Sequence, residues 1–242
     1  MILKVIASSS KGNAYILDNG KHQLLIECGV KMQDIKAALD FDLTKIAGCL
    51  ISHEHSDHSK CVKDVIGCGI DVYASKGTNE ANKLIKSHRI HSCEPLKPFE
   101  IMDFQIYPFP VEHDCAEPFG YVIYDLISKQ RVLFATDTHM LQYKFKNVDH
   151  YLIECNYDED TISQNNKNGT LEGFRYQRIL DSHMGLNTLV DAIKSHTGTP
   201  KTITLIHLSD QNINEGTVTT RIYKEFGLMP NIADTGITIE LT

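Results

Sequence analysis

The chain has 242 residues, of which 42% are hydrophobic and 23% are charged. This composition is that of an ordinary globular protein, and we expect a single domain over residues 1–242. The formal net charge of −7 and the pI near 5.9 argue against binding of nucleic acid by bulk electrostatic attraction. They leave room for an enzyme that meets phosphate through bound metal ions, whose charge the formal count omits.

The seven cysteines are scattered along the chain and form no Cys-x-x-Cys pair. An odd, scattered set does not suit a secreted disulfide framework, so we expect a reducing compartment. The N-terminal segment MILKVIASSSKGNAYIL turns polar at Ser8, which predicts a first strand rather than a signal peptide. Because no apolar run of the sequence approaches the length of a membrane span, we expect a cytoplasmic protein without a membrane partner.

In chain order, the first part of the sequence consists of short apolar runs separated by turns. Asn19-Gly20 is a strong hairpin signal between two of these runs. The spacing of Ile35 and Leu39 predicts a helix over 32–41. The runs that we predict to be strands are 3–7, 14–18, 22–29, 45–52, 71–75, 104–111, 119–127, 131–137 and 150–156.

The chain turns polar from Tyr157 to Gly173, and we expect a loop or a poorly ordered segment there because no apolar face is evident. Helical periodicity then predicts helices over 186–196 and 216–227, and an apolar run predicts a strand over 202–209. No repeat, low-complexity tract or linker divides the sequence. The loose alternation of strands and helices favours an α/β layered sandwich.

The segment ISHEHSDHSK, residues 51–60, places three histidines and two acids directly after an apolar run. His53 and His55 can converge on one ion beyond the end of a strand, while Asp57 and His58 can face a second ion. Imidazole and carboxylate ligands together suit zinc, iron or manganese. A solvated loop is the alternative, and it would suit a lone histidine better than this cluster. Burying such a cluster without a cation would be costly, because protonated histidines repel one another.

HEHSDH resembles the His-x-His-x-Asp-His signature of the metallo-β-lactamase fold, and four further segments match motifs of that family in order. The segments are LLIECG (24–29), with Glu27 where the family has aspartate, VEHDCAEPFGY (111–121), with His113, LFATDT (133–138), with Asp137, and LIHLSD (205–210), with His207. Each downstream motif alone would be weak evidence. Five motifs in order, covering nearly the whole chain, make the resemblance specific.

The resemblance implies a four-layer αββα sandwich with two divalent metal ions, zinc or manganese, at the strand ends. Carried over by residue, one ion would be held by His53, His55 and His113, the other by Asp57, His58 and His207, with Asp137 shared between them. Only 69 residues lie between the last two motif ligands, Asp137 and His207. That spacing leaves no room for the large inserted domain of the β-CASP nucleases.

The fold hosts β-lactamases, thioesterases, flavoprotein oxidases and nucleases, so the fold alone does not identify the substrate. Three segments, SSSKGNAYIL, VEHDCAEPFGYVI and ECNYDED, are similar to those of the YycJ/WalJ-like exonucleases. The HLSD context of the last histidine is similar to the nucleic-acid-processing branches. The resemblance therefore implies a phosphodiesterase, an exonuclease acting on DNA rather than RNA, in which a hydroxide bridging the two ions attacks phosphorus.

Two residues are candidates for catalysis. Asp57 would orient the hydroxide as well as bind metal. His183, in a segment that resembles a motif at the start of a helix in the subgroup, would contact phosphate or donate a proton to the leaving oxygen, and a surface or capping histidine is the alternative. Further side chains could touch a nucleic-acid backbone, although a solvated face is the commoner explanation: Lys11, Arg175, Arg178 and Ser209. We expect surface positions for the histidines outside the motifs, among them His139, His150 and His196.

Two rival functions remain open from the sequence. A small-molecule hydrolase of the same fold would cleave a thioester, a lactone or a cyclic phosphodiester, and the net charge of −7 mildly favours it. A binding module with a degenerate site is the other alternative. The complete set of ligand motifs argues against that alternative, since a decayed site should have lost at least one ligand.

Overall fold

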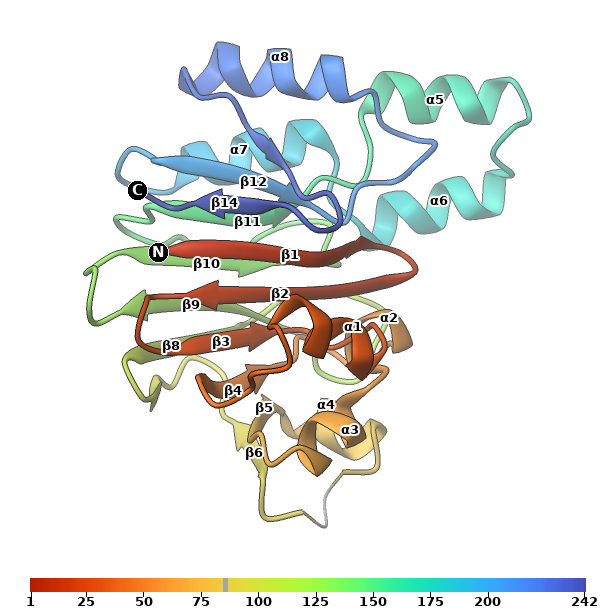
Figure 1. Cartoon of the computed structure of the whole chain (residues 1–242). Helices are drawn as coiled ribbons and strands as arrows, with labels where there is room; N and C mark the ends of the chain where they lie inside the picture. Colours follow the sequence, from red (N-terminus) through yellow and green to blue (C-terminus); the bar gives the residue numbers. More distant parts are fainter. Residues whose placement is uncertain (85–86) are drawn as a thin grey trace.

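The computed structural model describes residues 1–84 and 87–242, and within them two β-sheets stack face to face (Figure 1). The first sheet, sheet A, runs in the order β14 (Thr238–Glu240), β1 (Ile2–Ser9), β2 (Gly12–Asp18), β3 (Gln23–Ile26), β4 (Ile46–Leu50), β5 (Val72–Ser75) and β6 (Ile90–Cys93). The second, sheet B, runs in the order β13 (Asn231–Ile232), β12 (Thr202–Ile206), β11 (His150–Glu154), β10 (Arg131–Ala135), β9 (Phe119–Asp125), β8 (Phe104–Pro110) and β7 (Phe99–Ile101).

Both sheets change from antiparallel to parallel pairing along their width. In sheet A the strands from β3 to β6 are parallel, and in sheet B the strands from β10 to β13 are parallel. The carboxyl ends of parallel neighbours lie at the same edge of a sheet. The loops that follow β4, β10, β11 and β12 are therefore the ones that can build a shared site.

Side chains alternate between the two faces of each strand, and both faces are buried. In β3, Leu24 and Ile26 point into the core between the sheets, while Leu25 packs under the helices of sheet A. In β10, Phe134 lies between the sheets and Leu133 packs toward the helices of sheet B. Burial on both faces explains why these strands read as continuous apolar runs in the sequence.

Helices cover the outer face of each sheet. On sheet A, Ile35 and Val65 belong to the outer core, and on sheet B, Leu189 and Ile222 do the same. The helices are α1 (Met32–Ala38), α2 (Ser56–Ser59), α3 (Val62–Gly67), α4 (Lys76–Ala81), α5 (Glu159–Lys167), α6 (Gly173–Ser182), α7 (Leu186–Ser195) and α8 (Glu215–Phe226). The predicted αββα sandwich is confirmed.

The predicted loop over 157–173 is wrong, because this segment contains α5. The helix begins after Asp158, whose side chain accepts a hydrogen bond from the backbone N–H of Thr161 at 2.9 Å. Its one fully buried side chain, Ile162, packs in a small separate core with Leu171. A cap and one buried contact stabilise the helix, and neither produces the repeating apolar pattern that identifies a helix in a sequence.

Helix α6 follows directly and packs against α5 through the same small core, which Tyr176 and Ile179 extend. In Figure 1 the two helices lie together at the end of the sandwich opposite the chain termini. At their own end of the sandwich the two termini are adjacent, since the amino group of Met1 donates to the carbonyl of Leu241 at 3.1 Å. Within the described part of the chain, every helix is too short or too polar to cross a lipid bilayer.

The predicted surface positions of His150 and His196 are also wrong. His150 is fully buried in β11, and its Nδ1 lies 2.9 Å from the hydroxyl of Thr202 on the neighbouring strand. His196 stacks on Tyr151 and lies 3.1 Å from its hydroxyl. The partners of both histidines are distant in the sequence, so the sequence does not reveal these contacts.

Candidate metal centre

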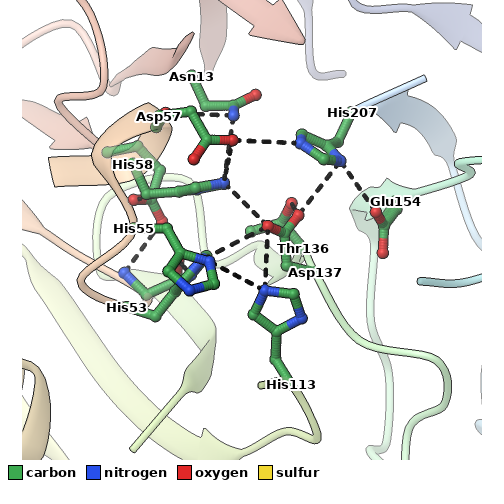
Figure 2. Close-up of polar contacts among 12 residues, drawn as sticks. Asn13, His53, His55, Asp57, His58, His113, Thr136, Asp137, Glu154 and His207 are labelled. Carbon is green, nitrogen blue, oxygen red and sulfur yellow. Dashed lines mark hydrogen bonds and ion pairs between the residues drawn. The ribbon is translucent and has the colours of Figure 1, made fainter. Parts of the chain in front are cut away.

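The loops at one edge of the sandwich bring all seven predicted ligands together (Figure 2). His53 and His55 follow β4, and the one-turn helix α2 carries Asp57 and His58. The other three ligands follow strands of sheet B: His113 follows β8, Asp137 follows β10, and His207 follows β12. Side chains separated by up to about 150 positions in the sequence thus meet because their strands end at the same place.

Asp137 lies at the centre of the cluster (Figure 2). Its Oδ2 is 3.1 Å from His58 Nε2, 3.5 Å from His53 Nε2 and 3.7 Å from His113 Nε2. Its Oδ1 is 3.2 Å from His207 Nδ1. One carboxylate therefore touches both halves of the cluster.

The seven predicted ligands form two compact groups that share this carboxylate, and a third candidate group joins Asp137 and His207 to Glu154 and His183. In each group the candidate atoms lie within 4.8 Å of one another, and the two groups of predicted ligands are His53, His55, His113 and Asp137, and Asp57, His58, Asp137 and His207. This division matches the one that the family resemblance implies. That each group binds one ion stays a prediction.

Three residues in and beside the cluster have a strained backbone conformation. Glu27, Asp137 and His207 each follow a strand and adopt left-handed φ angles of 65°, 47° and 52°. Such a conformation costs a non-glycine residue about 1–3 kcal/mol, and it persists where the surrounding structure holds it. The strained turns direct these side chains inward at the ends of the strands.

Gly29 explains the glycine of the LLIECG segment. A Cβ on this residue would lie 1.6 Å from the carbonyl oxygen of Asp57, so no side chain fits. The close approach is reinforced by the N–H of Cys28, which donates to the carbonyl of His58 at 2.8 Å. The end of β3 thereby supports α2 and the two ligands that it carries.

Glu27 and Asn13 contact the part of the cluster that α2 carries. Glu27 is fully buried, accepts a hydrogen bond from the N–H of Ser52 at 3.0 Å, and places Oε2 3.5 Å from His58 Nδ1. Asn13 Nδ2 lies 3.3 Å from the carbonyl of Asp57 and 3.3 Å from His58 Nε2. Both residues occur in segments that the sequence analysis singled out, but neither was predicted to act in the site.

Glu154 is a site residue that the sequence analysis missed, although it lies in the quoted segment ECNYDED. This fully buried carboxylate ends β11, and its Oε1 is 2.6 Å from His183 Nδ1 and 2.9 Å from His207 Nδ1. Its Oε2 accepts the N–H groups of Thr138 and Met184 at 3.1 and 3.2 Å. Glu154 therefore ties one predicted metal ligand to the predicted proton donor.

His183 lies between two helices, as the C-cap of α6 and three residues before the start of α7 at Leu186. Its side chain is 19% exposed and lines a groove beside the cluster. Since Nδ1 faces Glu154, Nε2 is the ring nitrogen left for a ligand. A catalytic role for His183 stays a prediction.

The charges of the cluster are strongly coupled. Burial raises the pKa of Asp57, but hydrogen bonds from His207 and His58 outweigh it and hold that pKa below its usual range. Burial lowers the pKa of His207, but Asp137, Asp57 and Glu154 outweigh it and raise the pKa to about 10. Nearby positive charge therefore stabilises these carboxylates, and a divalent cation can supply that charge in place of protons.

The residues present fit divalent metal ions. Nε2 of His53 and Nε2 of His207 are buried and lack a hydrogen-bond partner among the described residues. A buried polar atom without a partner is costly, and a bound cation satisfies a lone pair of a neutral imidazole. Imidazole nitrogens with carboxylate oxygens form a ligand set suited to zinc or manganese.

The residues with weaker sequence evidence lie outside the ligand groups. His139 Nε2 is 3.2 Å from Glu112 Oε2, away from the two ligand groups. Arg178 pairs with Asp114 at 3.1 Å on the surface of α6. The hydroxyl of Ser209 accepts the N–H of Asn212 at 3.3 Å, as a turn hydroxyl does.

Comparison with known proteins finds two similar curated proteins. The chain is 29% identical over 228 residues to exodeoxyribonuclease WalJ of Streptococcus pneumoniae, covering 86% of this chain and 81% of that protein. It is 28% identical over 173 residues to exodeoxyribonuclease YycJ of Bacillus anthracis, covering 65% of this chain and 64% of that protein.

A solved structure shares the fold. The metallo-β-lactamase fold protein YhfI of Bacillus subtilis superposes with a TM-score of 0.75 at 16% identity, over 99% of each chain. The family described as the beta-lactamase superfamily domain matches residues 22–208, a span that contains all seven predicted ligands. This chain is therefore a member of the beta-lactamase superfamily, as its five ordered motifs predict.

Proposed function

We propose that this protein is a metal-dependent phosphodiesterase that removes nucleotides from an end of DNA. The supporting observation is the pairing of two ligand groups around Asp137 with a groove that carries arginines. The similarity to WalJ and YycJ, both named exodeoxyribonucleases, supports DNA as the substrate.

In this proposal, each of the two ligand groups holds one divalent ion, zinc or manganese. When bound there, such ions would supply positive charge to the phosphoryl oxygens and would lower the pKa of water to near neutrality. The side chains of the protein fix the positions of the groups that take part. Asp137 sets the distance between the two groups. Glu27 orients the His58 ring from its Nδ1 side, and Asn13 holds the backbone carbonyl of Asp57.

Asp57 acts on the attacking water, and His183 acts on the leaving oxygen. Asp57 has a side chain that is 22% exposed, while that of Asp137 is 4% exposed, and an oxygen of Asp57 orients the attacking water. As the bond between phosphorus and the leaving oxygen breaks, His183 donates the proton that this oxygen needs. Glu154 holds the ring by Nδ1 and stabilises its charged form, so that Nε2 faces the groove.

The surroundings of the site favour a nuclease over a small-molecule hydrolase. A closed apolar pocket would suit a thioester or a lactone. The groove beside His183 and His207 has a volume of about 500 Å³ and is lined by two arginines and several polar side chains. Local positive charge of this kind suits a phosphate backbone in spite of the net charge of −7.

The test is digestion of end-labelled single- and double-stranded DNA and RNA by protein with measured metal content. We expect DNA to be shortened one nucleotide at a time from one end, and turnover to disappear in His55→Ala. His139→Ala is the matched control, because this nearby histidine lies outside the ligand groups. Inert nucleic acids together with a cleaved thioester or lactone would contradict the proposal, and absence of all turnover and metal would favour a binding module.

A further inference from the structure

Two grooves lie on either side of α6, next to the metal centre. The first groove, of about 500 Å³, includes His183 and His207 and runs along the segment 208–212. The second groove, of about 740 Å³, includes His113 and His139. Three residues of α6 line both grooves: Phe174, Arg178 and Ser182.

The three shared residues form a ridge along one face of the helix. They are spaced four positions apart, which places them above one another on an α-helix. At the inner end, the carbonyl of Ser182 lies 3.3 Å from His113 Nδ1, so the ridge reaches the metal centre. At the outer end is Phe174, about 12 Å along the helix axis from Ser182.

The two grooves differ in charge. The first carries Arg175 in addition to the shared arginine, against the single acid Asp210. The second carries three acids, Glu112, Asp114 and Asp181, one of which pairs with the shared Arg178. A polyanion is therefore attracted to the first groove and repelled from the second.

Among the described residues, Phe174 is the most exposed large hydrophobic side chain, at 82%. An exposed ring on the same helix as two arginines suits a nucleobase, because bases stack on aromatic rings while cations hold the adjacent phosphates. Polar side chains line the opposite wall, among them Asn156, Gln211 and Asn212. The same groove thus offers a stacking surface, positive charge and polar groups in a row leading to the metal centre.

Resting on the proposed function, we propose that the first groove takes one DNA strand, with a base stacked on Phe174 and a phosphate on Arg175. Single-stranded DNA is the occupant because its bases are free to stack, whereas paired bases are not. At about 3.4 Å per stacked nucleotide, the 12 Å ridge places that base about two to four nucleotides from the cleaved bond. Phe174 is then a specificity-determining residue for strand binding, outside the catalytic cluster.

The first test compares Phe174→Ala with the wild-type holoenzyme on an eight-nucleotide DNA strand and on bis-p-nitrophenyl phosphate. We expect KM for the strand to rise about tenfold, because one stacked base contributes on that order to binding. The kcat/KM for the small diester, which does not extend from the metal centre to Phe174, should not change. Phe174→Tyr should restore KM, and Phe41→Ala, a 70% exposed phenylalanine that lines neither groove, is the matched control.

The second test maps the stacked base with strands that carry one abasic site. In the wild type, an abasic site two to four nucleotides from the cleaved end should raise KM about tenfold. In Phe174→Ala the same abasic site should have no further effect. Arg175→Ala should reduce the slope of log KM against log salt by about 0.7, the change expected for one phosphate contact, while Arg221→Ala on α8 should not.

The outcomes separate the two proposals. If the wild type digests DNA but Phe174→Ala leaves KM and the abasic profile unchanged, the strand assignment is overturned and the proposed function stands. If the wild type does not digest nucleic acid, both are overturned. Because the ring of Phe174 is almost fully solvent-exposed, its removal should leave the circular dichroism spectrum and the melting temperature unchanged.

Discussion

The metal centre and the α5–α6 pair lie side by side but are built by different means. The metal centre sits on strand ends between two large hydrophobic cores, with buried ligands such as His53, His58 and Asp137. The α5–α6 pair rests on a small separate core around Ile162 and Leu171. The first region therefore has the stability of the whole sandwich, while the second can open on its own at lower cost.

This difference suits the chemistry that we propose for each region. Ligands of a metal centre must keep their geometry to within a fraction of an ångström, which rigid strand ends provide. A helix that guides a flexible strand only has to present a ring and positive charge in approximately the right place. Removing a part of the first region should abolish turnover, whereas loosening the second should weaken DNA binding and leave turnover of a small diester unchanged.

The largest effect should follow from Asp137→Asn. The substitution removes the one charge that both ligand groups share, so we expect the bound metal to fall below one ion per chain. Turnover of bis-p-nitrophenyl phosphate should fall about a thousandfold, the loss of several kcal/mol of transition-state stabilisation. Elemental analysis and initial rates measure the two effects. A variant that keeps two ions and full turnover would show that Asp137 is not the shared ligand.

The stability of the sandwich can be tested at His150, at the opposite end of β11 from Glu154. Burial lowers the pKa of His150 to about 4 from an ordinary 6.5. The folded protein then binds fewer protons than the unfolded chain between these pH values, so stability is lost as pH falls from 6.5 toward 4. The loss is about 3 kcal/mol at pH 4. Urea unfolding with a chelator present should show a smaller loss for His150→Gln, and parallel pH curves for the two proteins would contradict this.

An intermediate effect is expected for Glu154→Gln. The variant keeps the shape but loses the charge that holds His183 and His207, so we expect activity to fall about 10- to 100-fold. The loss should appear in kcat for DNA, with a shifted pH profile, while KM stays near its wild-type value. Glu100→Gln, on the exposed edge of β7, is the control. Equal pH profiles for Glu154→Gln and the wild type would argue against a positioning role.

The smallest effect should come from Asp158→Ala, which removes the N-cap of α5 and costs that helix about 1 kcal/mol. Faster hydrogen exchange in α5 and α6 would report the loosening. KM for DNA should rise a few-fold, and turnover of bis-p-nitrophenyl phosphate should stay the same. Asp158→Asn keeps the oxygen that accepts from Thr161 but loses the second one, which accepts the N–H of Asn214 at 2.7 Å, so its effect should lie between those of the wild type and Asp158→Ala. A loss of small-diester turnover would instead mean that the pair supports the metal centre directly.

The sandwich and its ligands were accessible from the sequence because each depends on local patterns. A strand buried on both faces shows a continuous apolar run, as β10 does before Asp137. A ligand loop is recognisable when its metal-binding residues are close together in the sequence, as they are from His53 to His58. The family's motifs then linked these segments in order.

The residue patterns predicted an α/β layered sandwich, and the family resemblance of five ordered motifs added the αββα architecture and the seven candidate ligands. Only the tertiary structure decided that Glu154 joins His183 to His207, that 159–167 is helical, and that Phe174 borders two grooves of opposite charge. The physical reason is distance along the chain. Glu154 is separated by 29 and 53 positions from its partners, and a helix held by one cap and one buried isoleucine has no periodicity to read.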